Sequence, residues 1–335
     1  MSAPVVLITP EPFFHVRGAW VEHLEAAGLA VRYPEDTRFC EGNSSPQETI
    51  REMQGVAAVI SGGDRFTAEV ITGLPDLRVI ARAGVGYDRV DVPAATAHGI
   101  PVTITPTANH EAVAEAAIAL LFALAKQIVP NDARTRSGAW AKGPTRPVRG
   151  QTLGILGLGR IGRSCALRAR GLGMHVLATE AYPDTAFVEQ HAIELAPLEA
   201  LLARSDYITL HCPLNDTTRG MFNRSLLRRM KPGSALINTA RGGLVVEADL
   251  LEALRSGHLS GAGLDVFEQE PAAGDNPLFR LENVVLSPHV AGIDEYSLRD
   301  MAIESADCII RLARGEWPAG AVVNDELRSS WKWRS

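Results

Sequence analysis

Short apolar runs alternate with helix-like patterns along almost the whole chain, and no other feature restricts the fold as strongly. The runs expected to form buried strands cover residues 5–8, 56–60, 78–81, 102–104, 152–156, 175–179, 206–211, 235–238, 261–265 and 283–287. The segments between them have helical patterns, and one begins with Ser45-Pro-Gln-Glu48, a capping box with proline at the first helical position. Such alternation is typical of parallel sheets covered by helices on both faces, so we predict an α/β fold.

The alternation falls into two blocks, which indicates two domains with doubly wound parallel sheets. One block ends near residue 103, and the other runs from about residue 150 to 290. A long apolar helix is expected over residues 110–128, and another helix over residues 295–313. Because these two helices lie on either side of the second block, they are candidates for crossing between the domains.

Composition and charge narrow the class of protein. With 335 residues, of which 46% are hydrophobic and 21% charged, the chain has the make-up of a globular protein with sizeable cores. A net charge of −6 argues against a nucleic-acid scaffold, without excluding a local basic patch. The longest apolar run, residues 116–125, is too short to span a membrane. We therefore expect neither a nucleic-acid partner nor a membrane partner.

The cellular compartment is predicted from the N-terminal residues and the cysteines. Residues 1–10 lack the basic segment of a secretory signal, so no such signal is expected. The four cysteines form no CxxC pair. Reduced thiols in a cytoplasmic protein are the simplest interpretation.

The stretch TLGILGLGRIGR, residues 152–163, has the glycine spacing of a dinucleotide-binding turn. Gly157 allows a tight turn, Gly159 lets the backbone approach a pyrophosphate, and Gly162 lets the next helix pack against the strand. The N-terminus of that helix offers amide groups and a positive dipole to phosphates. Glu180 ends the next expected strand, near the usual spacing of about 20 residues, where it would bind ribose hydroxyls and repel a 2′-phosphate. This pattern predicts NAD rather than NADP; the alternative is an ordinary turn with a surface glutamate.

A second glycine-containing turn, ARAGVGYDRVD at residues 81–91, follows an expected strand of the first block. It has no third glycine and no downstream acid, so a second dinucleotide is not expected. The amides of Val85 and Gly86 are candidates for binding a small anion, and the alternative is a plain tight turn. Arg82 beside them is either a phosphate ligand or a surface residue that pairs with Asp88.

Three polar side chains follow strands of the second block. Arg241 comes after ALINTA, Glu270 lies in LDVFEQEP, and His289 lies in VVLSPHVAG. Ligands of open parallel sheets bind outside the carboxyl ends of the strands, so we expect these side chains to cluster at one edge. Each also has a purely structural interpretation, in which Arg241 pairs with Glu270 and His289 is a hydrogen-bonded core histidine.

From about residue 50 to 320 the sequence resembles the D-isomer-specific 2-hydroxyacid dehydrogenase family, which includes phosphoglycerate dehydrogenases and glyoxylate/hydroxypyruvate reductases. The motifs that carry the resemblance are RAGVGYDRVD, EAVAE, GILGLGRIG, HCPLNDTTRGMFN, NTARGGLVVEADLLEAL, GAGLDVFEQEP and LSPHVAG. The resemblance implies a Rossmann-type NAD-binding domain, residues 104–293, inserted into a smaller flavodoxin-like substrate-binding domain, residues 1–103 and 294–335. It also implies a homodimer built largely on the NAD-binding domain.

The family pattern implies roles for individual residues of this chain. Arg241 would bind the substrate carboxylate and carbonyl, His289 would be the acid/base, and Glu270 would be the partner of His289. The substrate carboxylate would also be held by Ser61, Val85 and Gly86. The residues implied at the cofactor are Gly157, Gly159, Arg160, Ile161 and Gly162 at the pyrophosphate turn, Glu180 at the ribose, Cys212 and Pro213 at the adenine, Thr239 and Asp265 at the nicotinamide, and also Ala240 and Gly292.

Two departures from the family pattern concern the substrate. Arg89 stands where family members commonly have asparagine. The stretch SGGD, residues 61–64, is less basic than phosphoglycerate enzymes tend to be there. Both departures leave the identity of the substrate open.

The side-chain chemistry agrees with the implied roles. The planar fork of an arginine binds a carboxylate through two parallel hydrogen bonds. Hydride addition to a 2-oxo acid creates an alkoxide, which a histidine can protonate because it titrates near neutrality. We therefore predict an NAD-dependent oxidoreductase without a metal ion that interconverts a small D-2-hydroxy acid and its 2-oxo acid. Phosphoglycerate, or hydroxypyruvate and glyoxylate, are favoured over lactate.

Two alternatives stay open at this point. The first is a dinucleotide-sensing, corepressor-like interaction protein on the same fold, against which the intact Arg241, Glu270 and His289 argue. The second is a dehydrogenase of another small anion, such as formate or phosphite, which would use the same arginine and histidine. Reduction of 2-oxo acids distinguishes the predicted enzyme from both.

Overall fold

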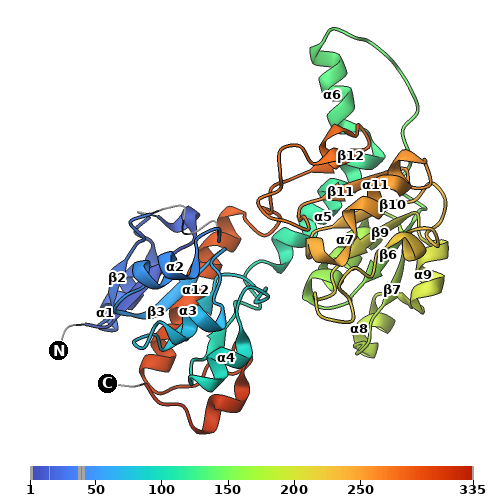
Figure 1. Cartoon of the computed structure of the whole chain (residues 1–335). Coiled ribbons are helices and arrows are strands. Elements are labelled where there is room, and N and C mark those ends of the chain that lie inside the picture. Colours follow the sequence, from blue (N-terminus) through green and yellow to red (C-terminus); the bar gives the residue numbers. More distant parts are fainter. Residues whose placement is uncertain (1–2, 15, 37–38, 40–41, 334–335) are drawn as a thin grey trace. The chain divides into compact units, whose positions relative to one another are not determined.

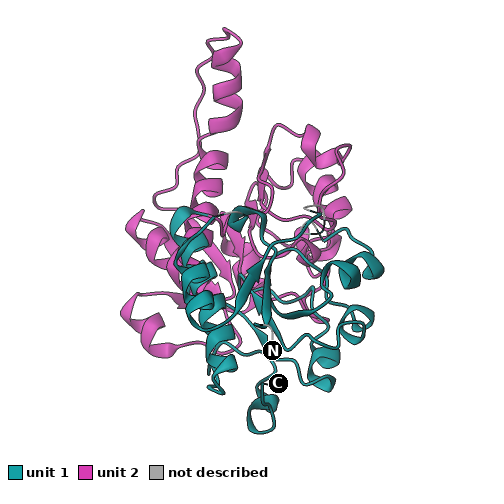
Figure 2. Ribbon diagram, turned by 90° about the vertical axis from the view of Figure 1, so that its left-hand side faces the viewer, with its two compact units in different colours: residues 1–109, 294–335 teal, residues 110–293 magenta. Residues whose placement is uncertain are grey.

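This computed structural model describes residues 3–14, 16–36, 39 and 42–333. The chain divides into two compact units, one formed by Met1–Asn109 with Asp294–Ser335 and the other by His110–Ile293 (Figure 2). Each unit contains a parallel sheet with helices on both faces, as the alternation predicts. Cys40, one of the four cysteines, lies outside the described residues.

The first unit has a five-stranded sheet in the order β2-β1-β3-β4-β5, which is the flavodoxin-like order. Its strands are β1 (Val5–Ile8), β2 (Ala30–Arg32), β3 (Val56–Ser61), β4 (Val79–Arg82) and β5 (Val102–Thr103). Its helices are η1 (Glu11–Phe13), α1 (Ala19–Ala26), α2 (Pro46–Glu52), α3 (Ala68–Thr72), α4 (Val92–Ala97), α12 (Glu295–Ala313) and η5 (Asp325–Ser329). α1 and α12 pack together on one face of the sheet, and α2, α3 and α4 cover the other (Figure 1). All six residues of β3 are buried because helices cover both faces.

The second unit has a seven-stranded sheet in the order β12-β11-β10-β9-β6-β7-β8, which is the Rossmann order extended by one strand. Its strands are β6 (Thr152–Leu156), β7 (His175–Thr179), β8 (Glu194–Leu195), β9 (Tyr207–Leu210), β10 (Ala235–Asn238), β11 (Gly261–Leu264) and β12 (Val284–Leu286). Its helices are α5 (His110–Ala125), α6 (Ile128–Arg136), α7 (Arg160–Gly171), α8 (Thr185–Gln190), α9 (Leu198–Arg204), α10 (Arg224–Leu227), η3 (Gly242–Leu244), α11 (Glu247–Arg255) and η4 (Pro277–Arg280). α5 and α7 pack on one face, and α9 and α11 on the other.

The helix expected over residues 110–128 is broken in the structure. α5 ends at Ala125, Gln127 has a left-handed backbone (φ 51°), and α6 continues at 58° to α5. No residue of α6 is buried, and Figure 1 shows this helix projecting from the rest of its unit. No single helix in the described part of the chain is long and apolar enough to cross a membrane, although the bent pair of α5 and α6 meets that test by length and composition alone.

Two short edge strands, β2 and β8, were not predicted from the sequence. β2 has three half-buried residues, and both residues of β8 are exposed. Neither has the apolar run by which the buried strands are identified, because an edge strand needs less burial than a central one. The central strands, in contrast, lie within a residue or two of the expected positions.

Candidate active site

The glycine-rich turn joins β6 to α7 at the carboxyl end of the second unit's sheet. Gly157 has φ +95°, and a Cβ on it would lie 2.7 Å from the carbonyl carbon of His211. A Cβ on Gly162 would lie 2.1 Å from the carbonyl oxygen of Gly157, so the helix can pack this closely only without a side chain there. A Cβ on Gly159, in contrast, would meet no described atom within 4 Å. The geometry of the turn itself therefore requires glycine at positions 157 and 162, whereas the space beside Gly159 is open to a ligand.

The N-terminus of α7 is available to an anion. Its N-cap is Gly159, which contributes no side-chain hydrogen bond, and its first turn contains no acidic residue. The free amide groups and the helix dipole of such an N-terminus favour phosphate. Arg160 and Ile161 are the first two residues of this helix, so their amides lie where the sequence places a pyrophosphate.

Glu180 follows β7 and lies directly beside the glycine-rich turn. One carboxylate oxygen accepts a 2.6 Å hydrogen bond from the amide of Leu158, and the other accepts a 3.0 Å hydrogen bond from the amide of Tyr182. The acid and the glycines, which are distant in sequence, are thus brought together. A carboxylate oxygen has a second lone pair, so these bonds leave acceptor capacity for a ribose hydroxyl.

The segment after β9 packs against the same turn. The ring of His211 lies with Nε2 2.9 Å from Thr209 Oγ1 and 3.3 Å from Cys165 Sγ. Burial lowers the pKa of His211 to about 3, so its ring is neutral, and burial raises the pKa of the Cys212 thiol to about 11. Neither is therefore a ready acid, base or nucleophile at neutral pH. Cys212 is half-buried and Pro213 exposed, which suits residues that line a ligand rather than react with it.

Asn238, which the sequence analysis missed, shapes the turn that carries Arg241. Its side chain is buried at the end of β10, where Nδ2 donates to the carbonyl of Arg241 (2.9 Å) and Oδ1 accepts from the amide of Ala240 (3.1 Å). Arg241 is half-buried and donates through Nη1 to the carbonyl of Ala240 at 2.7 Å. Thr239 Oγ1 is buried and has no hydrogen-bond partner within the described ranges. The only signal for Asn238 in the sequence was a polar residue closing an apolar strand.

Gly242 fixes the Arg241 turn against the loop that leads to Glu270. A Cβ on Gly242 would lie 1.9 Å from the carbonyl carbon and oxygen of Phe267 and 2.6 Å from the amide nitrogen of Glu268. The neighbouring Gly243 has no such backbone contact, because its Cβ would meet the end of the Leu214 side chain at 3.0 Å. Two loops from different strands thus approach closely at Gly242, a residue without a side chain.

His289 and Glu270 form a hydrogen-bonded pair. Nδ1 of His289 lies 2.8 Å from Oε2 of Glu270, whose other oxygen accepts from the amide of Phe267 at 3.1 Å. Because a carboxylate can only accept, Nδ1 carries the proton. The His289 side chain is 48% exposed, whereas that of Glu270 is 20% exposed. The glutamate therefore orients a histidine that remains accessible to a ligand.

Asp265 holds the loop that carries His289. It is 1% exposed, and its carboxylate accepts hydrogen bonds from the amides of Val290 and Ala291, both at 3.0 Å, and from the hydroxyl of Ser287 at 2.5 Å. Its carbonyl accepts from the amide of His289 at 2.7 Å. The sequence placed Asp265 against a nicotinamide; that contact stays a prediction, and the role seen here is to hold this loop. Gly292 continues the same loop and is half-buried.

In the first unit, the three residues predicted to hold the substrate carboxylate differ in accessibility. Ser61 is 0% exposed, and its Oγ accepts a 2.9 Å hydrogen bond from Nη1 of Arg82. Its burial gives no support to a direct contact with substrate. Val85 and Gly86 are half-buried, and across the ranges that the structure describes their amides make no hydrogen bond. Arg82 is half-buried and donates to Gly86 and Ser61.

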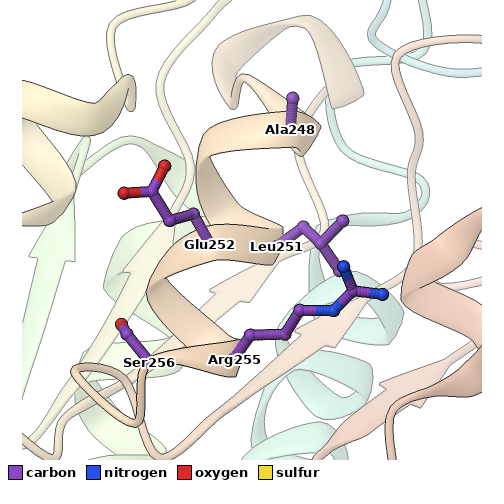
Figure 3. A pocket seen from close by; sticks show the side chains of 5 residues that line it. All are labelled: Ala248, Leu251, Glu252, Arg255 and Ser256. Atoms are coloured by element: carbon purple, nitrogen blue, oxygen red, sulfur yellow. The ribbon is translucent and has the colours of Figure 1, made fainter.

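The residues present fit a dinucleotide. The uncapped N-terminus of α7, the open position beside Gly159 and the unpartnered Thr239 hydroxyl are features that a pyrophosphate and a ribose would complete. A separate surface depression lies along α11, lined by Ala248, Leu251, Glu252, Arg255 and Ser256 (Figure 3). It contains none of the residues predicted for the site.

Comparison with known proteins gives the family. Residues 118–291 match the model of the D-isomer-specific 2-hydroxyacid dehydrogenase NAD-binding domain. Glyoxylate reductase of Korarchaeum cryptofilum is 42% identical over 287 residues, covering 84% of this chain and 85% of that protein. D-3-phosphoglycerate dehydrogenase of Mycobacterium leprae is 40% identical over 301 residues, covering 87% of this chain and 57% of that protein.

A solved structure agrees with the sequence comparisons. D-lactate dehydrogenase from Aquifex aeolicus, complexed with NAD and lactic acid, matches with a TM-score of 0.82 and 28% identity, covering 95% of this chain and 98% of that one. The chain therefore belongs to the D-isomer-specific 2-hydroxyacid dehydrogenase family and is an NAD-dependent oxidoreductase that interconverts hydroxy acids and oxo acids.

Proposed function

We propose that this chain reduces small, unphosphorylated 2-oxo acids to D-2-hydroxy acids with NADH, and that glyoxylate and hydroxypyruvate are its best substrates. The observation that carries the proposal is the His289–Glu270 pair, with 2.8 Å between Nδ1 and Oε2. The loop that leads to Glu270 also approaches the Arg241 turn closely at Gly242. A cation for the carboxylate and an imidazole for the carbonyl oxygen are what this reaction requires from a protein. The similarity to glyoxylate reductase over most of both chains supports this choice of substrate.

The proton and the substrate anion are handled by these three side chains. Arg241 binds the carboxylate of the 2-oxo acid through its planar guanidinium. NADH, when bound, would supply a hydride to C2. Nε2 of the protonated His289 would give its proton to the oxygen that becomes the hydroxyl. Glu270 accepts the Nδ1 proton in a hydrogen bond, which fixes the ring tautomer and stabilises the imidazolium. General acid catalysis of this kind contributes about 10²–10⁴-fold.

The cofactor is held by the second unit. The amides of Arg160 and Ile161 bind the pyrophosphate, and Glu180 accepts hydrogen bonds from the adenosine ribose while repelling a 2′-phosphate. Cys212 and Pro213 line the adenine. Support comes from the uncapped start of α7 and from the position of Glu180, 2.6 Å from the amide of Leu158. The enzyme is accordingly selective for NADH over NADPH.

The first unit contributes backbone groups to the substrate. The amides of Val85 and Gly86 bind the substrate carboxylate, as an anion nest does. Their support is that both residues are accessible and that neither amide makes a hydrogen bond within the described part of the chain. Ser61 takes no direct part, because it is fully buried.

We further propose a cytoplasmic homodimer in which α6 contacts the second copy. No residue of α6 is buried, and Ile128 and Val129 at its start are 56% and 52% exposed. Trp140, in the segment that follows, is 81% exposed. Apolar side chains gathered on a projecting element are typical of an interface. Light scattering tests this: the parent should have the mass of two chains and Ile128→Glu that of one, and a monomeric parent contradicts it.

A substrate panel tests the proposed reaction. NADH and NADPH oxidation are followed with glyoxylate, hydroxypyruvate, phosphohydroxypyruvate and pyruvate, and NAD reduction with formate. Glyoxylate and hydroxypyruvate should give the highest kcat/KM with NADH, and Glu180→Ala should relax the discrimination against NADPH. Preference for phosphohydroxypyruvate would contradict the substrate class, and failure to reduce any 2-oxo acid would contradict the proposal as a whole.

A further inference from the structure

Arg82, the last residue of β4, connects two loops of the first unit that are far apart in sequence. These are the SGGD loop (residues 61–64) and the GVGYD loop (residues 84–88). Nε of Arg82 donates to the carbonyl of Gly86 at 3.0 Å. Nη1 donates to Ser61 Oγ at 2.9 Å and to the carbonyl of Gly62. One guanidinium thus binds both loops at once, which its rigid fork of donors makes possible.

Arg89 makes a second connection from the far end of the GVGYD loop. Its Nη1 donates to the carbonyl of Gly63 at 2.5 Å, and its own carbonyl accepts from the amide of Phe66 at 2.9 Å. The SGGD loop is therefore hydrogen-bonded by Arg82, which precedes the GVGYD loop, and by Arg89, which follows it. Asparagine, the residue common at this position in the family, is too short to reach as far as an arginine does.

Asp64, the last residue of the SGGD loop, anchors this loop to Thr9 through a buried carboxyl group. Asp64 is 1% exposed and accepts hydrogen bonds from the amide of Gly62, at 3.0 Å, and from the hydroxyl of Thr9. Burial raises the pKa of the Asp64 carboxyl group, and its hydrogen bonds and the charge of Arg82 act in the opposite direction. Breaking these buried hydrogen bonds would leave polar groups unpaired, so the arrangement resists displacement of the SGGD loop.

The two arginines act on the backbone that the proposed function uses. Arg82 fixes the carbonyl of Gly86, which belongs to one of the two residues whose amides receive the substrate carboxylate. The guanidinium groups that a phosphate would seek on these loops are directed to carbonyls of Gly62, Gly63 and Gly86 instead. Their contribution is therefore geometric.

We propose that Arg82 and Arg89 are positioning residues that hold the SGGD and GVGYD loops in the arrangement in which the Val85 and Gly86 amides bind the substrate carboxylate. This inference rests on the proposed function. It assigns to Arg89, a departure from the family pattern, a part in binding small 2-oxo acids. It also explains why Ser61 is buried, since its hydroxyl is one of the acceptors in the brace.

Steady-state kinetics with glyoxylate test the proposal. Arg82→Met and Arg89→Met remove the donors while keeping an unbranched side chain, and Arg65→Met is the matched control because Arg65 is exposed in the same segment. The first two variants should each raise KM for glyoxylate about tenfold or more, the effect of losing a charged hydrogen bond. The Kd of NADH should stay within about twofold, and Arg65→Met should behave as the parent does. Equal KM values in all four proteins would overturn the proposal.

Two further variants distinguish positioning from simple loss of charge or of folding. Arg82→Lys keeps the charge but cannot reproduce the fork, so its KM should stay raised; full recovery would mean that charge alone matters. In Arg82→Met/Arg89→Met the two effects should be less than multiplicative, because both residues hold the same pair of loops. Independent, fully multiplicative effects would contradict a shared brace.

Hydrogen exchange separates failure of this inference from failure of the proposed function. Amides in residues 61–66 and 83–90 should exchange faster in Arg82→Met and Arg89→Met than in the parent or in Arg65→Met. This readout does not depend on turnover. If the parent reduces no 2-oxo acid, the proposed function fails, and the exchange rates still decide whether the arginines hold the loops. Unchanged exchange in both variants would overturn the brace whatever the activity.

Discussion

His289 has a backbone conformation that few residues other than glycine adopt, with φ at +57°. Such a conformation costs about 1–3 kcal/mol and persists only where the surroundings hold it in place. Asp265 provides that hold through the amides of residues 289, 290 and 291 and the hydroxyl of Ser287. The strained backbone of His289, after β12, is thus held by a buried carboxylate that follows the neighbouring strand β11.

Replacing Asp265 by asparagine tests this link. The side-chain NH2 would replace one carboxylate oxygen and face an N–H group, of Val290 or of Ala291, that needs an acceptor, so the His289 loop should lose its geometry. We expect the free energy of unfolding to fall by about 1–3 kcal/mol, the cost of leaving buried polar groups unpaired, and kcat to fall with it. Urea unfolding and steady-state kinetics measure the two effects. A variant with parental stability and kcat would show that Asp265 does not hold this loop.

The buried ring of His211 should make stability depend on pH. Burial lowers its pKa from 6.5 to about 3, so between these values the unfolded chain binds a proton that the folded protein does not. The stability that depends on the neutral His211 ring is complete above about pH 6.5. Below that pH this part of the free energy of unfolding declines toward pH 3, by at most about 1.4 kcal/mol per pH unit. The unfolding free energy of His211→Gln should therefore fall less steeply than that of the parent between about pH 7 and pH 5. Identical slopes would contradict this, and the exposed His175→Gln is the control.

For single residues, the sequence indicated which side chains suit the reaction better than it indicated which atoms they contact. Arg241, Glu270 and His289 could be named because each follows a strand and each suits the reaction. Asn238 was missed, and the hold of Asp265 on the His289 loop was not foreseen. Their hydrogen-bond partners lie in turns whose geometry depends on packing between strands, and a linear sequence does not display it.

At the scale of elements, the site depends on loops that approach one another closely. The Arg241 turn and the loop before Glu270 meet at Gly242, where a Cβ would lie 1.9 Å from the Phe267 backbone, far inside van der Waals contact. The glycine-rich turn is built in the same way, with Gly162 against the carbonyl of Gly157. The relevant property of these glycines is the missing side chain, which the sequence alone indicated only for the dinucleotide turn.

A pair of alanine variants tests the close approach. Gly242→Ala should push the two loops apart, lowering kcat/KM for glyoxylate by about tenfold or more and reducing stability by about 1–3 kcal/mol, as overpacking does. Gly243→Ala is the matched control, since the nearest described atoms to its Cβ would be the movable side-chain ends of Leu214 and Arg219. Thermal unfolding and kinetics on both variants measure the effect. If the two behave alike, the contact at Gly242 has no role in the site.

Over the whole molecule, the fold class was predictable because buried parallel strands are continuous apolar runs. The positions of β3, β6 and β10 follow directly from such runs. The interruption of one unit by the other was implied by family resemblance and not by periodicity, since no pattern along the chain reveals that its two ends belong to one compact unit. The break at Gln127 was missed because a left-handed residue leaves the apolar pattern unchanged.

We propose above all that His289 gives a proton to the substrate oxygen when the 2-oxo acid is reduced with NADH. The most direct test compares the parent with His289→Ala, measuring kcat with glyoxylate and the Kd of NADH on the same preparations. In His289→Ala, kcat should fall about 10²–10⁴-fold while the Kd of NADH changes little, because the histidine acts on the substrate oxygen and not on the dinucleotide. An unchanged kcat in His289→Ala would contradict it.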